Sequence, residues 1–173
     1  MNIQRTSRLF LLGIVLTFLS LVEARAAVLQ SGRAYAFSMP AEWRYASESV
    51  ATLMHQRTGV KLTLAHADSA MLKIEHAATL GSEAYTLQIA DNDIVVRAAS
   101  VKGVNWAMAQ LAQLLSAAGG RPLECATLKS SPRFEHRGLM IDCSRHFRTI
   151  AELESMIDAM NLLRLNVLHL HLT

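Results

Sequence analysis

The chain has 173 residues, of which 51% are hydrophobic and 18% are charged. This composition excludes an intrinsically disordered chain, and the length allows one domain, or a small domain with part of another. The formal net charge of +3 would point to a basic protein if it were spread over the whole chain, but much of the excess lies near the N-terminus.

Residues 1–26 have the pattern of a secretory signal peptide. Arg5 and Arg8 precede 14 apolar or small residues from Leu9 to Val22, and Ala24-Arg25-Ala26 matches a cleavage site. The apolar stretch is shorter than the ~20 residues of a membrane span, although an uncleaved membrane anchor is the alternative. Cleavage would leave 14 basic and 13 acidic residues. We therefore expect an exported protein, periplasmic or secreted, with no nucleic-acid partner and no membrane attachment after cleavage.

Two cysteines follow the leader, Cys125 and Cys143. An exported protein can keep a disulfide, but one pair in a chain of this length is not a disulfide framework. Two free thiols explain the sequence equally well, so both alternatives stay open.

Residues 27–131 predict a small α+β domain. Apolar residues recur at helical spacing over 47–58 and 103–118, and glycines follow both segments where a helix would end. Residues 27–46 show no clear period. Alternation of apolar and polar residues predicts strands at 60–64, 72–74 and 123–127 and a hairpin over 84–97. This order describes a sheet with helices on one face.

The polar segment Lys129-Ser130-Ser131-Pro132 places a domain boundary at about 131. Beyond it, residues 137–142 and 165–172 read as two apolar strands. Thr149 and Glu152 form a capping-box pattern that begins a helix between them. Two strands with one helix between them make a βαβ unit with parallel strands.

A single βαβ unit cannot close its own sheet, so we expect this sequence to be an incomplete piece of a longer protein. The alternative is a complete mature protein whose last strand is an edge or a subunit contact, which would expose an apolar strand.

Candidate functional residues gather around the two strands of this unit. Functional groups collect at the carboxyl ends of strands in parallel α/β sheets and barrels. Five polar residues lie near such ends: Asp142, Arg145, His146, His169 and His171. They also have structural explanations, because an aspartate often caps a turn and an adjacent arginine can simply pair with it.

His169 and His171 are two residues apart on a strand and therefore share a face. Two such imidazoles could bind one Zn²⁺, which makes a barrel metallohydrolase an alternative function. They could equally be hydrogen-bonded core residues.

Two sequence blocks resemble a known family. Phe134–Phe147 and Leu165–Thr173 resemble the opening of the catalytic barrel of family 20 glycoside hydrolases, the β-N-acetylhexosaminidases. The upstream blocks Glu83–Ile89 and Ile94–Ala98, with the helix over 109–115, resemble the small α+β domain that precedes that barrel.

The resemblance implies an α+β accessory domain followed by a (β/α)₈ TIM barrel, of which residues 132–173 supply only the first βαβ. It implies removal of terminal β-linked N-acetylglucosamine or N-acetylgalactosamine from glycans, without metal or organic cofactor. The mechanism is substrate-assisted: the substrate's acetamido oxygen attacks the anomeric carbon, one Glu protonates the leaving oxygen and the preceding Asp orients the acetamido group. That Asp-Glu pair follows a later barrel strand and has no counterpart here, so no catalytic residue is assigned and the fragment alone is expected to be inactive.

The resemblance assigns sugar binding to Arg137, whose guanidinium offers several fixed donors to neighbouring hydroxyls. It implies a supporting shell for Asp142, Arg145, His146, His169 and His171. The role implied for Arg137 conflicts with its predicted position, because Arg137 begins its strand, whereas barrel sites lie at the carboxyl ends of strands.

Two further alternatives are a non-catalytic glycan-binding module and a purely structural role for residues 27–131. The sequence leaves the oligomeric state open.

Overall fold

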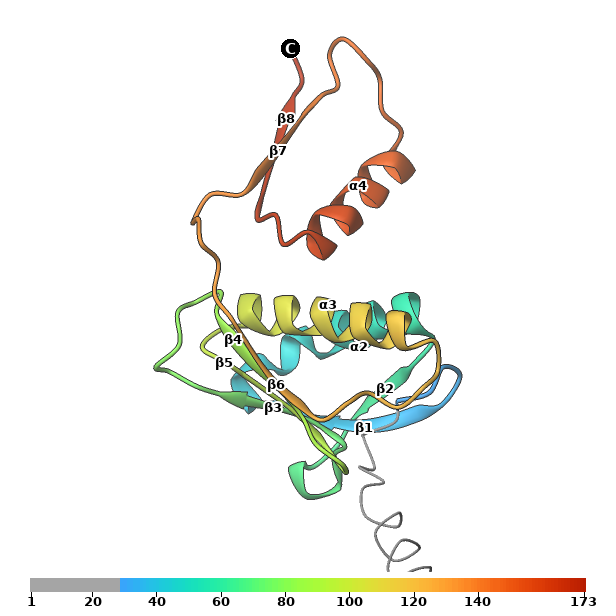
Figure 1. The fold of residues 1–173 in the computed structure, drawn as a ribbon. Helices are drawn as coiled ribbons and strands as arrows, with labels where there is room; N and C mark the ends of the chain where they lie inside the picture. Colours follow the sequence, from blue (N-terminus) through green and yellow to red (C-terminus); the bar gives the residue numbers. More distant parts are fainter. Residues whose placement is uncertain (1–28) are drawn as a thin grey trace, which may run out of the picture.

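The computed structural model describes residues 29–173, and the predicted signal peptide lies outside this range. Two α/β units follow one another along the chain, with a six-stranded sheet and its helices below a smaller βαβ unit (Figure 1). Within the described residues, no helix is long and apolar enough to cross a membrane.

The first sheet is mixed, with the strand order β2-β1-β3-β5-β4-β6. β2, β1, β3 and β5 run parallel to one another, whereas β4 is antiparallel to both β5 and β6. The antiparallel β4–β5 pair confirms the predicted hairpin. The strands are β1 (Ala34–Ser38), β2 (Lys61–Leu64), β3 (Leu72–His76), β4 (Tyr85–Ile89), β5 (Ile94–Ala98) and β6 (Ala126–Ser130).

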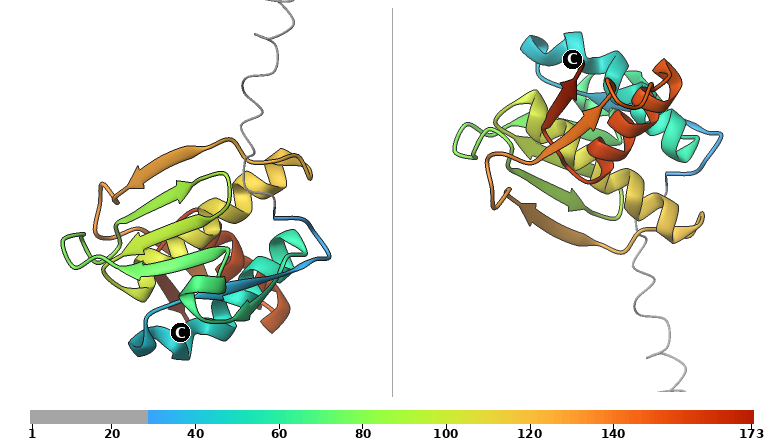
Figure 2. Two further views of the ribbon diagram at one scale, coloured as in Figure 1. Left: turned by 90° about the horizontal axis from the view of Figure 1, so that it is seen from below. Right: turned by 90° about the horizontal axis from the view of Figure 1, so that it is seen from above.

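Two helices, α2 (Ser47–Thr58) and α3 (Val101–Ala118), cover one face of this sheet (Figures 1 and 2). Each ends at a glycine in the left-handed region, Gly59 with φ 71° and Gly119 with φ 59°. Short 3₁₀ helices η1 (Ala41–Ala46) and η2 (Ala67–Ser69) connect other strands. The core between the layers includes fully buried apolar side chains from both, among them Phe37, Val50, Met54, Leu87, Met108 and Leu111.

The second unit consists of β7 (Gly138–Asp142), α4 (Ile150–Leu162) and β8 (Val167–His171). β7 and β8 are parallel, as predicted. The capping box is present, since Glu152 N donates to Thr149 Oγ1 and Thr149 N donates to a Glu152 carboxylate oxygen.

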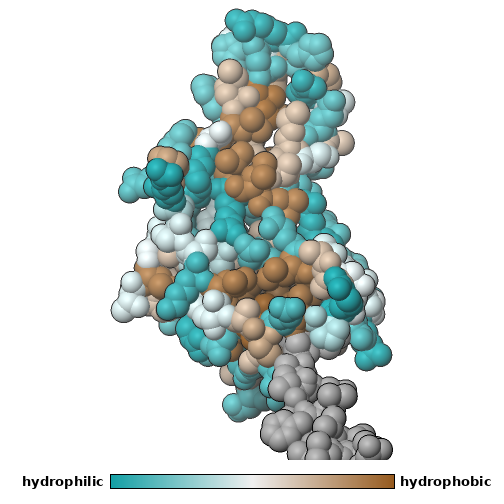
Figure 3. Space-filling view, viewed as in Figure 1, coloured by the Kyte–Doolittle hydropathy of each residue, from teal (hydrophilic) through white to brown (hydrophobic). Residues whose placement is uncertain are grey.

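The βαβ unit is more exposed than its apolar sequence predicts. Met140 is 59% exposed, and Leu139, Leu170 and Ile157 are also exposed. Figure 3 shows this apolar surface as brown patches on the upper part of the molecule. In parallel α/β folds both faces of such strands are covered, and residues 29–173 supply only α4 for this purpose.

Two elements of the first sheet differ from the sequence prediction. β1 was missed because Ala34–Ser38 lacks the usual alternation of apolar and polar residues: the exposed Ala34 is apolar, whereas the polar Ser38 is buried. β6 was predicted at 123–127 but spans Ala126–Ser130. Its bounds follow from pairing with β4, in which Ala126 lies opposite Ile89 and Ser130 opposite Tyr85.

Candidate active site

The polar residues at the carboxyl ends of β7 and β8 share one face of the two-stranded sheet. Asp142 lies directly opposite His171, and Met140 lies opposite His169. Because side chains alternate along a strand, these four project to the side opposite that of the buried Ile141. α4 lies beside the other face (Figure 1). In a closed barrel, whose helices form the outer ring, the Asp142–His171 face would point inward.

Asp142 organises the turn that follows β7. Its Oδ1 accepts hydrogen bonds from the backbone N–H groups of Ser144 (3.0 Å) and Arg145 (2.9 Å). Its Oδ2 lies 3.1 Å from Nη1 of Arg145. Asp142 therefore holds both the backbone and the guanidinium of Arg145. The supporting role that the resemblance implies for this aspartate stays a prediction.

Arg145 offers an accessible guanidinium at this end of the sheet. Its side chain is 86% exposed, so most of its guanidinium N–H groups face solvent. A hollow of about 460 Å³ beside β7 brings Asp142, Arg145 and His146 together, with Arg148 at its rim. His171 neighbours this group through its pairing with Asp142, whereas His169 lies two residues nearer the start of β8.

Arg137 lies at the opposite end of β7, immediately before its first residue. Its guanidinium donates to the carbonyl oxygens of Arg164 (Nε, 2.7 Å) and Phe134 (Nη1, 2.6 Å) and to the carboxylate of Glu83. It also lies over the ring of Trp106, 6.0 Å from the centroid. These partners engage three of the five N–H groups of the guanidinium, and the side chain is only 14% exposed, so this placement argues against contact between Arg137 and substrate.

Three polar residues around Arg137 were not identified from the sequence. Glu83 accepts from both Arg137 and Asn166. Arg164 has φ 58° and sends its guanidinium to Gln110 and to Ser130 Oγ. Glu83 and Asn166 were inside the blocks that carry the family resemblance. The available signal was a polar residue just before an apolar strand, since Asn166 directly precedes β8 and Glu83 lies two residues before β4.

Glu83 remains ionised despite its burial. Burial by itself raises the pKa of this carboxyl, but hydrogen bonds from Asn166 and Arg137, with the charge of Arg137, more than reverse that effect and hold the pKa below its usual value. Glu83 is therefore a charged acceptor that joins the two α/β units.

The described residues contain no group of three or more His, Cys, Asp or Glu side chains arranged to hold a metal ion. His169 and His171 do share a face, as their spacing predicted, with Asp142 opposite His171, but within residues 29–173 these side chains do not form a metal-binding group. Cys125 and Cys143 are free thiols, which resolves the alternative that the sequence left open.

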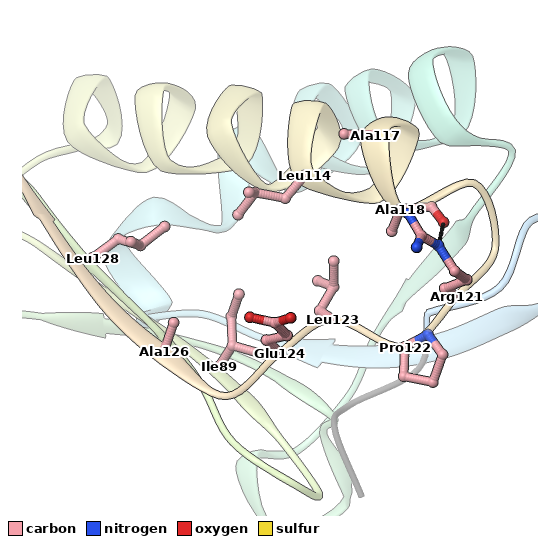
Figure 4. Close-up of a pocket in the computed structure, with 10 residues that line it drawn as sticks. All are labelled: Ile89, Leu114, Ala117, Ala118, Arg121, Pro122, Leu123, Glu124, Ala126 and Leu128. Atoms are coloured by element: carbon pink, nitrogen blue, oxygen red, sulfur yellow. Dashed lines mark hydrogen bonds between the residues drawn. The ribbon is translucent and has the colours of Figure 1, made fainter. Parts of the chain in front are cut away.

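A separate apolar groove of about 400 Å³ lies between the end of α3 and strands β4 and β6. Figure 4 shows Leu114, Leu123, Ile89 and Leu128 pointing into it, while Arg121 turns aside and donates to the carbonyl of Ala118. None of the sequence-predicted site residues lines this groove. It therefore has no part in the candidate active site.

Comparison with known families accounts for both units. Residues 19–129 match the model described as glycosyl hydrolase family 20, domain 2, and residues 134–173 match glycosyl hydrolase family 20, catalytic domain. The first match alone covers more than half of the chain. The chain belongs to glycosyl hydrolase family 20.

Curated relatives and solved structures agree with this family 20 assignment. A beta-hexosaminidase of Akkermansia muciniphila is 31% identical over 156 residues, which are 87% of this chain and 30% of the relative. A beta-N-acetylhexosaminidase of Cellulomonas fimi is 36% identical over 104 residues, 59% of this chain and 21% of the relative. A mutant Streptomyces plicatus beta-hexosaminidase in complex with the product GlcNAc superposes with TM-score 0.73 at 25% identity, over 87% of this chain and 32% of that one.

The family 20 chain therefore spans 30% or less of these curated relatives. The mixed sheet with its helices, and the solved family 20 structures that resemble it, fit an α+β accessory domain followed by the start of a barrel.

Proposed function

We propose that this chain supplies the accessory domain and the first βαβ unit of the catalytic barrel of a longer β-N-acetylhexosaminidase. The observation that carries the proposal is the ordered match to both family 20 domains, together with the polar cluster at the carboxyl ends of two parallel strands. The exposed apolar surface of the βαβ unit supports it, because further barrel strands and helices would cover that surface.

The substrates of this proposed enzyme are glycans that end in β-linked N-acetylglucosamine or N-acetylgalactosamine. Hydrolysis would proceed with retention: the acetamido oxygen of the substrate displaces the leaving group, which a Glu protonates, and water then opens the cyclic intermediate. The Asp-Glu pair for these steps is not among the 173 residues and would come from later barrel strands. The residues present here would bind and orient the sugar.

Arg145, rather than Arg137, is the sugar-binding arginine in this proposal. Arg145 lies beyond the carboxyl end of β7, where barrel enzymes bind substrate, and Asp142 holds its guanidinium in place. A guanidinium held by one carboxylate can still donate to neighbouring hydroxyls. Arg137 has none of these properties, since its donors are engaged at the other end of the strand.

The experiment begins with the coding DNA downstream of the Thr173 codon. An open frame that carries an Asp-Glu pair after a later predicted strand is expected. The complete protein should then hydrolyse a chromogenic N-acetylglucosaminide. A stop codon directly after Thr173 would exclude hydrolysis by this mechanism.

In the complete protein, Arg145→Ala should lower kcat/KM by about 10- to 100-fold, the effect of losing a hydrogen bond to a charged group. Arg97→Ala is the matched control, because Arg97 lies in the accessory sheet and pairs only with residues there. Wild-type kcat/KM in Arg145→Ala would refute the assignment of sugar binding to this residue.

The predicted leader supports export to the periplasm or the medium. Mature protein from the native host should begin at Ala27, as N-terminal sequencing would establish. An N-terminus at Met1 in the membrane fraction would instead indicate an uncleaved anchor.

A further inference from the structure

One carboxylate of the accessory domain meets the starting points of both strands of the βαβ unit. Glu83 lies in the turn before β4. Nη2 of Arg137 donates a hydrogen bond to its Oε2, and Nδ2 of Asn166 donates to its Oε1 at 3.0 Å. Arg137 directly precedes β7, and Asn166 directly precedes β8. Both residues lie more than 50 positions from Glu83 in the sequence, and both bind its side chain.

Arg137 and Asn166 are also joined to each other. Arg137 N donates to Oδ1 of Asn166 at 3.0 Å, and Asn166 N donates to the carbonyl of Arg137 at 2.8 Å. This reciprocal pair continues the β7–β8 ladder by one position before Gly138 and Val167. These bonds fix the register of β7 and β8 at their first residues. Glu83 of the accessory domain then binds both Arg137 and Asn166.

Burial distinguishes this contact from a surface ion pair. The side chains of Arg137 and Glu83 are 14% and 11% exposed, whereas those of Arg97 and Glu75, in a pair on the accessory sheet, are 40% and 46% exposed. Exposed pairs contribute little to stability, but removal of one partner of a buried pair leaves an uncompensated charge. The loss of Glu83 should therefore leave the Arg137 charge uncompensated and remove a hydrogen-bond acceptor from Asn166.

The backbone around Glu83 is constrained by packing, so its carboxylate can hold Arg137 and Asn166 in a defined position. The next residue, Ala84, is buried, and its carbonyl packs against Gly103 of α3. Arg164 gives a second link, since its guanidinium reaches Gln110 and Ser130 while its carbonyl accepts from Arg137.

We propose that Glu83 positions the first two strands of the catalytic domain, so that the accessory domain acts as the template on which the register and orientation of β7 and β8 are set. The contact lies at the amino ends of both strands, which leaves their carboxyl ends, with Asp142 and His171, clear of the accessory domain. Assembly of the two domains through Glu83 does not depend on which glycan is hydrolysed.

The test is amide hydrogen exchange on the 173-residue chain, read separately for β7–β8 and for β4–β5. Glu83→Gln should lower the protection of β7 and β8 amides by about tenfold or more, the change in equilibrium expected from loss of one hydrogen bond to a charged group. The β4 and β5 amides should keep their protection. Glu75→Gln is the matched control, a carboxylate of the same sheet in an exposed pair, and should leave both sets unchanged.

A second variant, Glu83→Asp, keeps the charge but draws the carboxylate back by one methylene from Arg137 and Asn166, and it leaves the residues of the two strands unchanged. It should reproduce the selective loss in β7 and β8. It decides the question if Glu83→Gln does not fold. Unchanged β7–β8 protection in the variants would overturn the proposal. An equal loss of protection in β4–β5 would also overturn it, because Glu83 would then support the accessory fold rather than position the strands.

Discussion

Gly103 of α3 packs closely against Ala98 of β5 and the carbonyl of Ala84, so its replacement by alanine sets the cost of packing against the gain in helix propensity. A Cβ at this position would lie 2.6 Å from the carbonyl oxygen of Ala84 and 3.0 Å from Cβ of Ala98. A backbone carbonyl and the fully buried Ala98 cannot rotate away. Propensity favours alanine by about 1 kcal/mol, whereas overpacking costs about 1–3 kcal/mol. Because the nearest atom belongs to backbone, we expect the upper end of that range and a net loss of about 2 kcal/mol.

The assay is thermal unfolding of the full chain followed by circular dichroism. A loss of about 2 kcal/mol should lower Tm by roughly 8–16 °C for a domain of this size. Gly81→Ala is the matched control, since its Cβ would lie 3.8 Å from Ala84 Cβ, an ordinary contact, and its φ is not positive. That variant should melt at or slightly above the wild-type temperature. A Gly103→Ala protein as stable as wild type would refute the argument that close approach requires this glycine.

Two other predictions concern the βαβ unit and its attachment. Thr149→Ala removes the side-chain oxygen that caps α4 and should destabilise the helix by about 1 kcal/mol. The measurement is faster amide exchange in the first turn of α4, with Thr149→Ser close to wild type and α3 unaffected. Glu83 has a folded-state pKa below its usual value of about 4.5, so its stabilising effect is complete above that value and is lost as pH falls through the lowered pKa. The urea midpoint of the wild type should therefore drop more steeply below about pH 4.5 than that of Glu83→Gln, and parallel pH profiles would contradict this assignment.

Local signals in the sequence were sufficient for much of the fold. The apolar periodicity and terminal glycines of α2 and α3 identify both helices, and alternation identifies the β4–β5 hairpin. The Thr149–Glu152 capping box begins α4 as predicted. These features depend on residues a few positions apart, which is the range over which helix caps and side-chain periodicity act.

The register of β6 and the partners of Glu83 depend on residues that are distant in the sequence. β6 begins where it does because Ala126 pairs with Ile89 of β4, and no feature near residue 126 specifies that register. The partners of Glu83 are likewise 54 and 83 positions away along the chain. Pairing between distant strands, and a carboxylate shared by two domains, are properties of the assembled structure and cannot be inferred from sequence spacing.

The two arginines of the Arg137–Arg145 block show why the motif alone did not separate their roles. They are eight residues apart, and β7 lies between them. Five residues of strand extend about 16 Å, so this short separation in sequence puts one guanidinium at the amino end of the strand and the other beyond its carboxyl end. Strand direction then decides their chemistry, because parallel barrels bind substrate only at the carboxyl ends. The same block therefore joins the accessory domain at one end, through Arg137, and in the proposed enzyme would present Arg145 to a sugar at the other.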